Sequence, residues 1–95
     1  MALVHDAFTV GTSATLIATI PAGNPTTTVA VVNEDNSSIF IGDSSVTASG
    51  VDKGLPVVKS TVYNIQLNAN DKLYAVSAAG TLANAVVVLY SKVIG

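Results

Sequence analysis

The triplet Gly42-Asp43-Ser44 is the stretch of this sequence whose residue types could do catalytic chemistry. It follows a short apolar run, Ile39 to Ile41, that has the composition of a strand. A serine placed directly after a strand can act as the nucleophile of a hydrolase, provided that a base accepts its proton. That base is usually a histidine that a carboxylate holds in position.

The sequence does not supply a histidine where such an enzyme needs one. Its only histidine, His5, precedes the triplet, and the C-terminal residues LYSKVIG contain none. In GDSL-type hydrolases, where a Gly-Asp-Ser supplies the nucleophile, the base lies near the C-terminus of a much longer chain that has helices. We therefore predict that residues 42–44 form a turn, that the protein has no catalytic residues and that it is not an enzyme. We expect His5 to point toward solvent or a neighbouring molecule.

Two pairs of acidic side chains offer the oxygen ligands that a cation would need. Glu34 and Asp35 lie in the polar segment NEDNSS, and Asp43 and Asp52 lie in a long loop. Neither pair has the alternating ligand spacing of a calcium loop. Turns rich in Asn and Asp are common because these side chains bond to the nearby backbone. We therefore expect no metal and no cofactor, with a cation or a partner's lysine between Asp43 and Asp52 as the alternative.

The composition restricts the classes of partner. A chain of 95 residues fits one domain, residues 1–95, around one core. With a net charge of −2, four lysines and no arginine, it lacks the basic surface that binds nucleic acid or an anionic membrane, so neither is an expected partner. The absence of cysteine excludes disulfides and thiolate metal sites. The N-terminal residues lack the pattern of a signal peptide, so we expect synthesis and assembly inside a cell.

The low charge predicts extensive contact with other molecules. Apolar residues make up 49% of the chain and charged residues 11%, whereas about a quarter of the residues in a typical soluble domain are charged. A lone monomer with this composition would be poorly soluble. We therefore expect partners to cover much of its surface.

Apolar residues that alternate with period two predict strands along most of the chain, and no segment has a helical period. The expected fold is all-β: an antiparallel β-sandwich or small barrel of about seven strands, jelly-roll-like. We predict that residues 4–10 and 86–90 form edge strands that need covering, that residues 28–33 are buried on both faces, and that residues 42–56 form a long loop. The predicted strands are residues 4–10, 14–20, 28–33, 39–41, 63–67, 73–77 and 84–90.

The order of motifs between residues 33 and 93 carries a family resemblance. The turn NEDNSS is followed by IFIGDSSVTASGVDKGLPV and then by YNIQLNANDKLYAVSAAGTLANAVVVLYSKV. This order resembles that of small β-sandwich head-decoration and minor capsid proteins of tailed bacteriophages. The matching positions are Ile41, Gly42, Val46, Thr47, Gly50, Leu55, Asp71, Leu73, Tyr74 and Ala75.

The resemblance implies a structural role: a decoration protein that binds the outer surface of the capsid and stabilises the shell. Its expected partners are the major capsid protein and further copies of itself, most simply in a closed trimer. It would be made in the host bacterial cytoplasm and reside on the virion surface. The alternatives are a tail or head-fibre module of a virion, and a host-surface or carbohydrate-binding module. The candidate contact residues are Val4, Phe8, Asp43, Val46, Val51 and Leu55.

Overall fold

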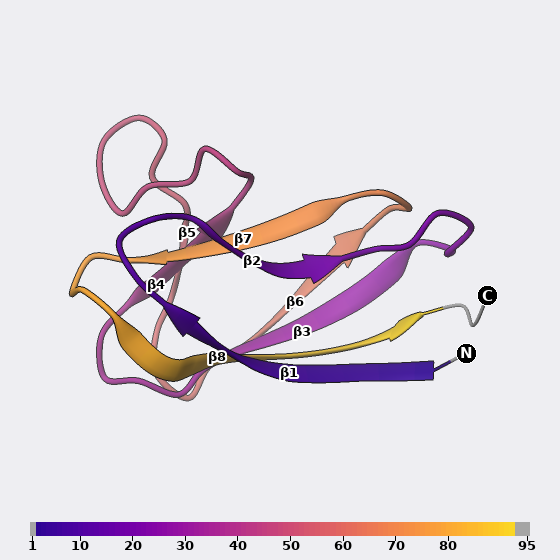
Figure 1. Ribbon diagram of the computed structural model, residues 1–95, viewed down its shortest axis with the longest axis horizontal. Helices are drawn as coiled ribbons and strands as arrows, with labels where there is room; N and C mark the ends of the chain where they lie inside the picture. The colour runs from indigo at the N-terminus through magenta and orange to yellow at the C-terminus, as the bar shows by residue number, and fades with distance from the viewer. Residues whose placement is uncertain (1, 93–95) are drawn as a thin grey trace.

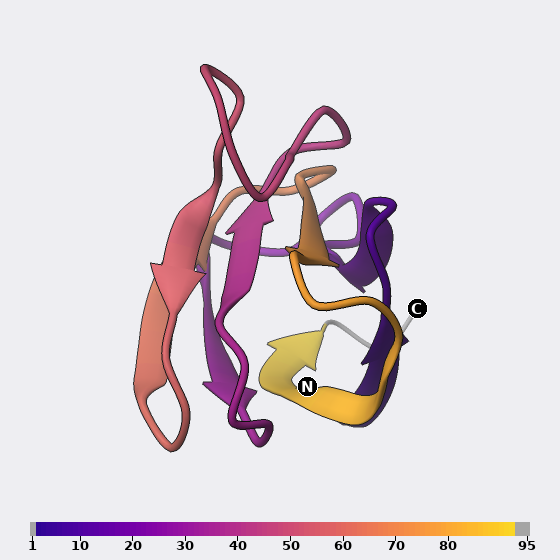
Figure 2. The same cartoon turned by 90° about the vertical axis from the view of Figure 1, so that its left-hand side faces the viewer.

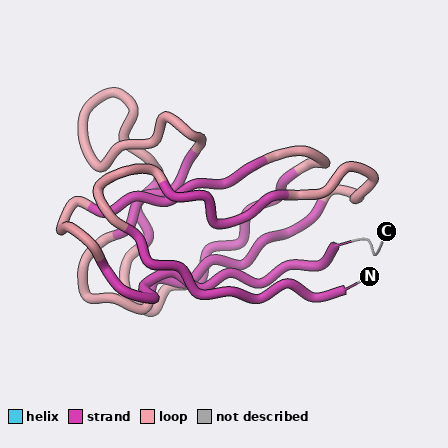
Figure 3. Tube along the Cα trace, viewed as in Figure 1, coloured by secondary structure: helices cyan, strands magenta, loops and turns pink. Residues whose placement is uncertain are grey.

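The computed structural model describes residues 2–92, which form eight strands and no helix (Figures 1 and 3). These residues accordingly include no helix long and apolar enough to cross a membrane. The strands are β1 (Ala2–Val10), β2 (Thr15–Thr19), β3 (Thr27–Asn33), β4 (Ile39–Gly42), β5 (Leu55–Val57), β6 (Val62–Leu67), β7 (Lys72–Ser77) and β8 (Leu82–Lys92).

The strands form two four-stranded antiparallel sheets. Sheet A has the order β1-β8-β3-β6, and sheet B has the order β2-β7-β4-β5. Apart from β4 and β5, each strand is followed by one in the other sheet, which is the arrangement of an eight-stranded jelly roll. The predicted jelly-roll-like antiparallel sandwich is therefore confirmed, with eight strands where the sequence indicated seven.

The additional strand, β5, overlaps the end of the loop predicted over residues 42–56. It has three residues with Pro56 at its centre, and Ile39 and Ile41 of β4 pair with Val57 and Leu55 on either side of the proline. Three residues are too few to display an alternating pattern, and a proline argues against a central strand. The proline is tolerated because β5 lies at the edge of sheet B.

The core lies between the sheets and consists mainly of Val and Ile, whose branched side chains suit a pleated surface. On β3, Val29 and Val31 point into this core and are fully buried. The prediction that residues 28–33 are buried on both faces is wrong. Thr28 is exposed and Ala30 is half-buried, because none of the described segments covers the outer face of sheet A.

The strands at the edges of sheet A differ from those predicted. The strand β1 is an edge strand as predicted, but β8 lies between β1 and β3 in the interior of sheet A, so the prediction for residues 86–90 is wrong. Apolar side chains occupy both faces of β8: Val86 and Val88 point into the core, and Leu89 points outward. Apolar residues on both faces are typical of a central strand. The pattern does not show which strands pair with β8, because that depends on residues far away in the sequence.

A buried amide joins the two sheets. Asn33, at the end of β3, is 0% exposed. Its side-chain Nδ2 donates to the carbonyl oxygen of Ser37 at 2.7 Å and to that of Val57, on β5, at 2.8 Å. Its Oδ1 accepts from the backbone N–H of Asp35 at 2.8 Å, and its own carbonyl oxygen accepts from the N–H of Ser60 at 2.9 Å. Asn33 thus holds both the turn after β3 and the edge strand of the opposite sheet.

We predict that Asn33→Asp lowers the free energy of unfolding by about 3 kcal/mol. The substitution keeps the size of the side chain but removes both donors and places a carboxylate beside two buried carbonyl oxygens. Urea unfolding followed by circular dichroism measures this loss. Asn36→Asp, the same change at an exposed position of the following turn, is the control: its Oδ1 accepts from Lys59 Nζ, a bond that aspartate keeps, and it should shift the free energy by no more than about 0.5 kcal/mol. Equal effects of the two substitutions would contradict this role for Asn33.

Candidate functional site: the arm between β4 and β5

Residues 43–54 connect β4 to β5 and project beyond the two sheets; we call them the arm (Figures 1 and 2). The arm begins with a turn in which the N–H of Val46 donates to the carbonyl oxygen of Asp43 at 3.0 Å. The N–H of Ser45 donates to the Asp43 side-chain Oδ1 at 2.8 Å. The catalytic-looking triplet thus leads into a turn, as predicted, and the aspartate bonds to local backbone.

The structure does not bring the serine of the triplet to the histidine. His5 is exposed on β1, where it pairs with Leu89 and points to the outer face of sheet A. Ser44 is exposed and follows β4 of sheet B. The thickness of the sandwich therefore separates the two side chains, and His5 points to solvent, as expected.

The distal half of the arm is ordered by its own hydrogen bonds. The N–H of Thr47 donates to the carbonyl oxygen of Asp52, and the N–H of Gly54 donates back to the carbonyl oxygen of Thr47, both at 3.0 Å. Between them Gly50 takes a positive φ of 81°, a conformation that glycine adopts without steric cost. The next residue, Val51, is fully exposed at 102%. The arm therefore presents an apolar side chain at its tip.

The base of the arm covers the outer face of sheet B. Val46 is 6% exposed and packs with Phe40 of β4 and Val76 of β7 in a second apolar cluster, separate from the main core. Gly54 permits this contact, since a Cβ there would lie 2.5 Å from the carbonyl oxygen of Ile41 and 2.5 Å from Val46 Cγ2. The chain thus closes the outside of this sheet with a segment of its own.

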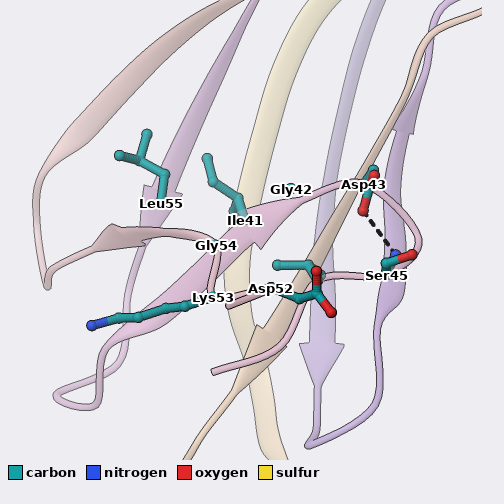
Figure 4. A pocket seen from close by; sticks show the side chains of 9 residues that line it. Ile41, Gly42, Asp43, Ser45, Asp52, Lys53, Gly54 and Leu55 are labelled. Carbon is teal, nitrogen blue, oxygen red and sulfur yellow. Dashed lines mark hydrogen bonds between the residues drawn. The ribbon is translucent and has the colours of Figure 1, made fainter. Parts of the chain in front are cut away.

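A pocket of about 410 Å³ lies between the arm and the adjoining ends of β4 and β5 (Figure 4). Asp43 and Asp52 line it, as does Lys53, whose Nζ lies 5.4 Å from the centre of the Phe40 ring. Two carboxylates fall short of the six to eight oxygen ligands that Ca²⁺ takes. Within residues 2–92, no group of three or more His, Asp or Glu side chains could hold a metal ion. The pocket can offer its carboxylates to a cationic side chain, which keeps the partner's lysine as a prediction.

The second acidic pair serves the backbone. Asp35 Oδ1 accepts from the N–H of Ser37 at 3.0 Å within the turn that Asn33 organises. Glu34 is exposed beside it. These contacts explain the polar segment 33–38 as a turn.

The six candidate contact residues fall into two groups. Three present their side chains to solvent, namely Asp43, Val51 and Leu55. Three pack within the molecule, namely Val4 and Phe8, which are half-buried against the core, and Val46 in the second cluster. Contact of any of them with a partner stays a prediction, for which the exposed group is the better placed.

Sequence reasoning missed the outer face of sheet A. Three large apolar side chains on it are exposed: Leu3 at 68%, Val62 at 55% and Leu89 at 45%. The signal was present in the last predicted strand, where apolar residues occupy both alternating positions. A strand that is apolar on both faces fits either a central core strand or one whose outer face binds a partner.

Comparison with protein-family models, with curated proteins and with solved structures found no match for this chain. A functional conclusion therefore rests on the resemblance described above, on the fold and on the arrangement of the exposed side chains.

We predict that Gly54→Ala lowers the free energy of unfolding by about 1 to 3 kcal/mol. The added methyl group would overlap backbone at Ile41 as well as the buried Val46, and overpacking of this kind costs energy in that range. Urea unfolding measures the loss. Gly11→Ala is the matched control, because its methyl group would meet Thr81 Oγ1 at an ordinary 3.5 Å and should not reduce stability. Unchanged stability in Gly54→Ala would show that the arm does not pack as described.

Proposed function

We propose that this protein is a structural component of a tailed-bacteriophage virion that binds the outer surface of the capsid and stabilises the shell. Its partners in this proposal are the major capsid protein and other copies of the chain, on the virion surface after synthesis in the host cytoplasm. The jelly-roll fold is compatible with this role, but jelly rolls also occur in lectins and cupins, so the fold alone does not decide between functions.

The observation that carries the proposal is the exposure of large apolar side chains on a chain with 11% charged residues. Contiguous apolar surface on a soluble domain marks contact with another macromolecule. A cement protein buries surface against both the shell and its own copies, which accounts for low charge and many small side chains. The exposed large apolar residues are Leu3, Leu16, Val51, Leu55, Val58, Val62 and Leu89.

The arm supports the proposal by its geometry. Its base is fixed to sheet B through Val46, so its tip is held in place while Val51 remains fully exposed. Leu55, which is 51% exposed, adds a second exposed apolar side chain where the arm enters β5. A preorganised apolar projection loses little conformational freedom when it docks, and this favours binding.

Stabilisation of the shell follows from mass action. A subunit that binds only the expanded shell lowers the free energy of that state, by about 2.7 kcal/mol per site at a free concentration one hundred times the Kd. Many sites on one shell add such contributions. The protein then needs no catalytic chemistry to perform its function.

We predict that the double variant Val51→Lys/Leu55→Lys binds undecorated capsids at least about tenfold more weakly, as expected when burial of two apolar anchors is lost. Co-sedimentation with purified capsids measures the binding. A thermal melt should be unchanged, because both side chains are exposed.

Ala22→Lys is the control, because Ala22 is exposed in the β2–β3 turn at the opposite end of the molecule from the arm (Figure 1). This variant should bind like the unsubstituted protein. Failure of the unsubstituted protein to co-sediment would contradict the proposed function. Equal binding by the double variant would show that the arm is not the contact, and binding to isolated tails but not to heads would favour a tail module.

A further inference from the structure

The central part of the outer face of sheet A is rich in apolar side chains and carries no charged one. Strand pairing places its residues in three rows across the sheet, and we call these twelve residues the open face. The first row is Ala7, Val87, Val32 and Val62, and the second is His5, Leu89, Ala30 and Asn64. The third combines two pairs that continue this register, Leu3 with Ser91 and Thr28 with Gln66.

The distribution of charge separates this face from the rest of the molecule. All ten charged side chains of the sequence, four lysines and six acidic residues, lie outside the three rows. His5 is the one titratable side chain within them. The first row is apolar across all four strands. Outward positions of a solvent-exposed sheet are normally polar, so the wholly apolar first row, with Leu89 and Leu3 beside it, favours contact with another surface.

The opposite sheet shows what such a cover does. The outward-facing Phe40 and Val76 of sheet B are buried under Val46 of the arm. Within residues 2–92, no corresponding cluster lies over sheet A, and Leu3, Val62 and Leu89 remain 45% to 68% exposed. The described residues therefore leave the open face uncovered.

We infer that the open face packs against the open face of a second copy of this chain, related by a two-fold axis. Each molecule carries a net charge of −2, so copies repel one another unless they meet through uncharged surface. A partner with a charged surface would have to bury that charge against apolar side chains, which is costly. The open face of a second copy has no charged side chain, so contact with it buries no charge and brings no like charges together. Two sheets can pack face to face about 10 Å apart with their side chains interdigitated.

The area of the sheet fits a weak contact between two copies. Four strands of 6 to 11 residues, about 4.8 Å apart with about 3.3 Å per residue, cover about 500 Å² of flat surface. If the whole outer face of the sheet takes part, two copies together bury about 1,000 Å², which is at the lower limit for a specific interface and below the roughly 1,200 to 2,000 Å² of stable ones. The contact is isologous and gives a dimer, which differs from the trimer expected from the sequence. Because the area is near this limit, the dimer should dissociate on dilution.

Sedimentation equilibrium of the purified protein over a wide concentration range tests the inference without any capsid. We expect a mass of twice 9.6 kDa at high concentration. Leu89→Lys and Val62→Lys should each reduce it to 9.6 kDa with an unchanged circular dichroism spectrum. Val51→Lys, which alters an exposed valine on the arm, should remain dimeric.

A crosslinking measurement covers the case in which a lysine variant does not fold. The chain has no cysteine, so Ala30→Cys near the centre of the open face introduces a single thiol, and a short bis-maleimide should link it to its counterpart in a dimer. Val51→Cys should not be linked.

A monomer at all concentrations, a trimer, or a dimer that persists in both lysine variants would overturn the inference. If the protein is a monomer and Leu89→Lys abolishes its binding to capsids, the open face contacts the shell and not a second copy. That result would overturn the inference of a dimer but would agree with the proposed function.

Discussion

The side-chain amide of Asn33 crosses from sheet A to sheet B, where its Nδ2 lies 2.8 Å from the carbonyl oxygen of Val57. The strand β5 depends on this bond more than a longer strand would, since it has three residues and a proline that cannot donate to β4. The arm ends where β5 begins, so the position of β5 sets the distance between the two ends of the arm. Asn33 itself lies at the end of β3, which also contributes Ala30 and Val32 to the open face. Both proposed contact surfaces are thus connected to one buried amide.

Both outer faces of the sandwich carry large apolar side chains, but the arm covers only those of sheet B. In sheet B, the arm places Val46 over Phe40 and Val76, so burial within the chain supplies the favourable free energy. In sheet A, the corresponding side chains remain in water, and burial becomes available only on association. The charged residues lie mainly in turns and in the arm, which keeps the open face free of charge. A single chain therefore uses the same hydrophobic effect for folding on one side and, in our proposal, for assembly on the other.

Apolar patterning was sufficient to predict the all-β class and seven of the eight strands. The turn predicted at residues 42–44 lies at residues 43–46, because Gly42 is the last residue of β4. The patterning did not predict β5, because three residues around Pro56 carry no periodic signal. It placed β8 at an edge, because the pairing of β8 with β1 and β3 depends on residues far away in the sequence. Asn33 was placed at the end of the strand predicted over residues 28–33 and in the polar turn that follows it, but its bond to Val57 was not predicted, since that bond follows from the position of β5 in the opposite sheet. The burial of Val46 was equally inaccessible, because it requires the arm to fold back over Phe40.

Cryo-electron microscopy of capsids incubated with the purified protein tests the central claim most directly, because it gives location, copy number and contact surface together. Our account predicts additional density on the outer surface of the shell that fits the two-sheet sandwich, with the tip of the arm at Val51 directed toward the shell and the open face of each subunit covered by another copy. Shells that are identical with and without the protein, or subunits bound with the open face in solvent and the arm pointing outward, would contradict it.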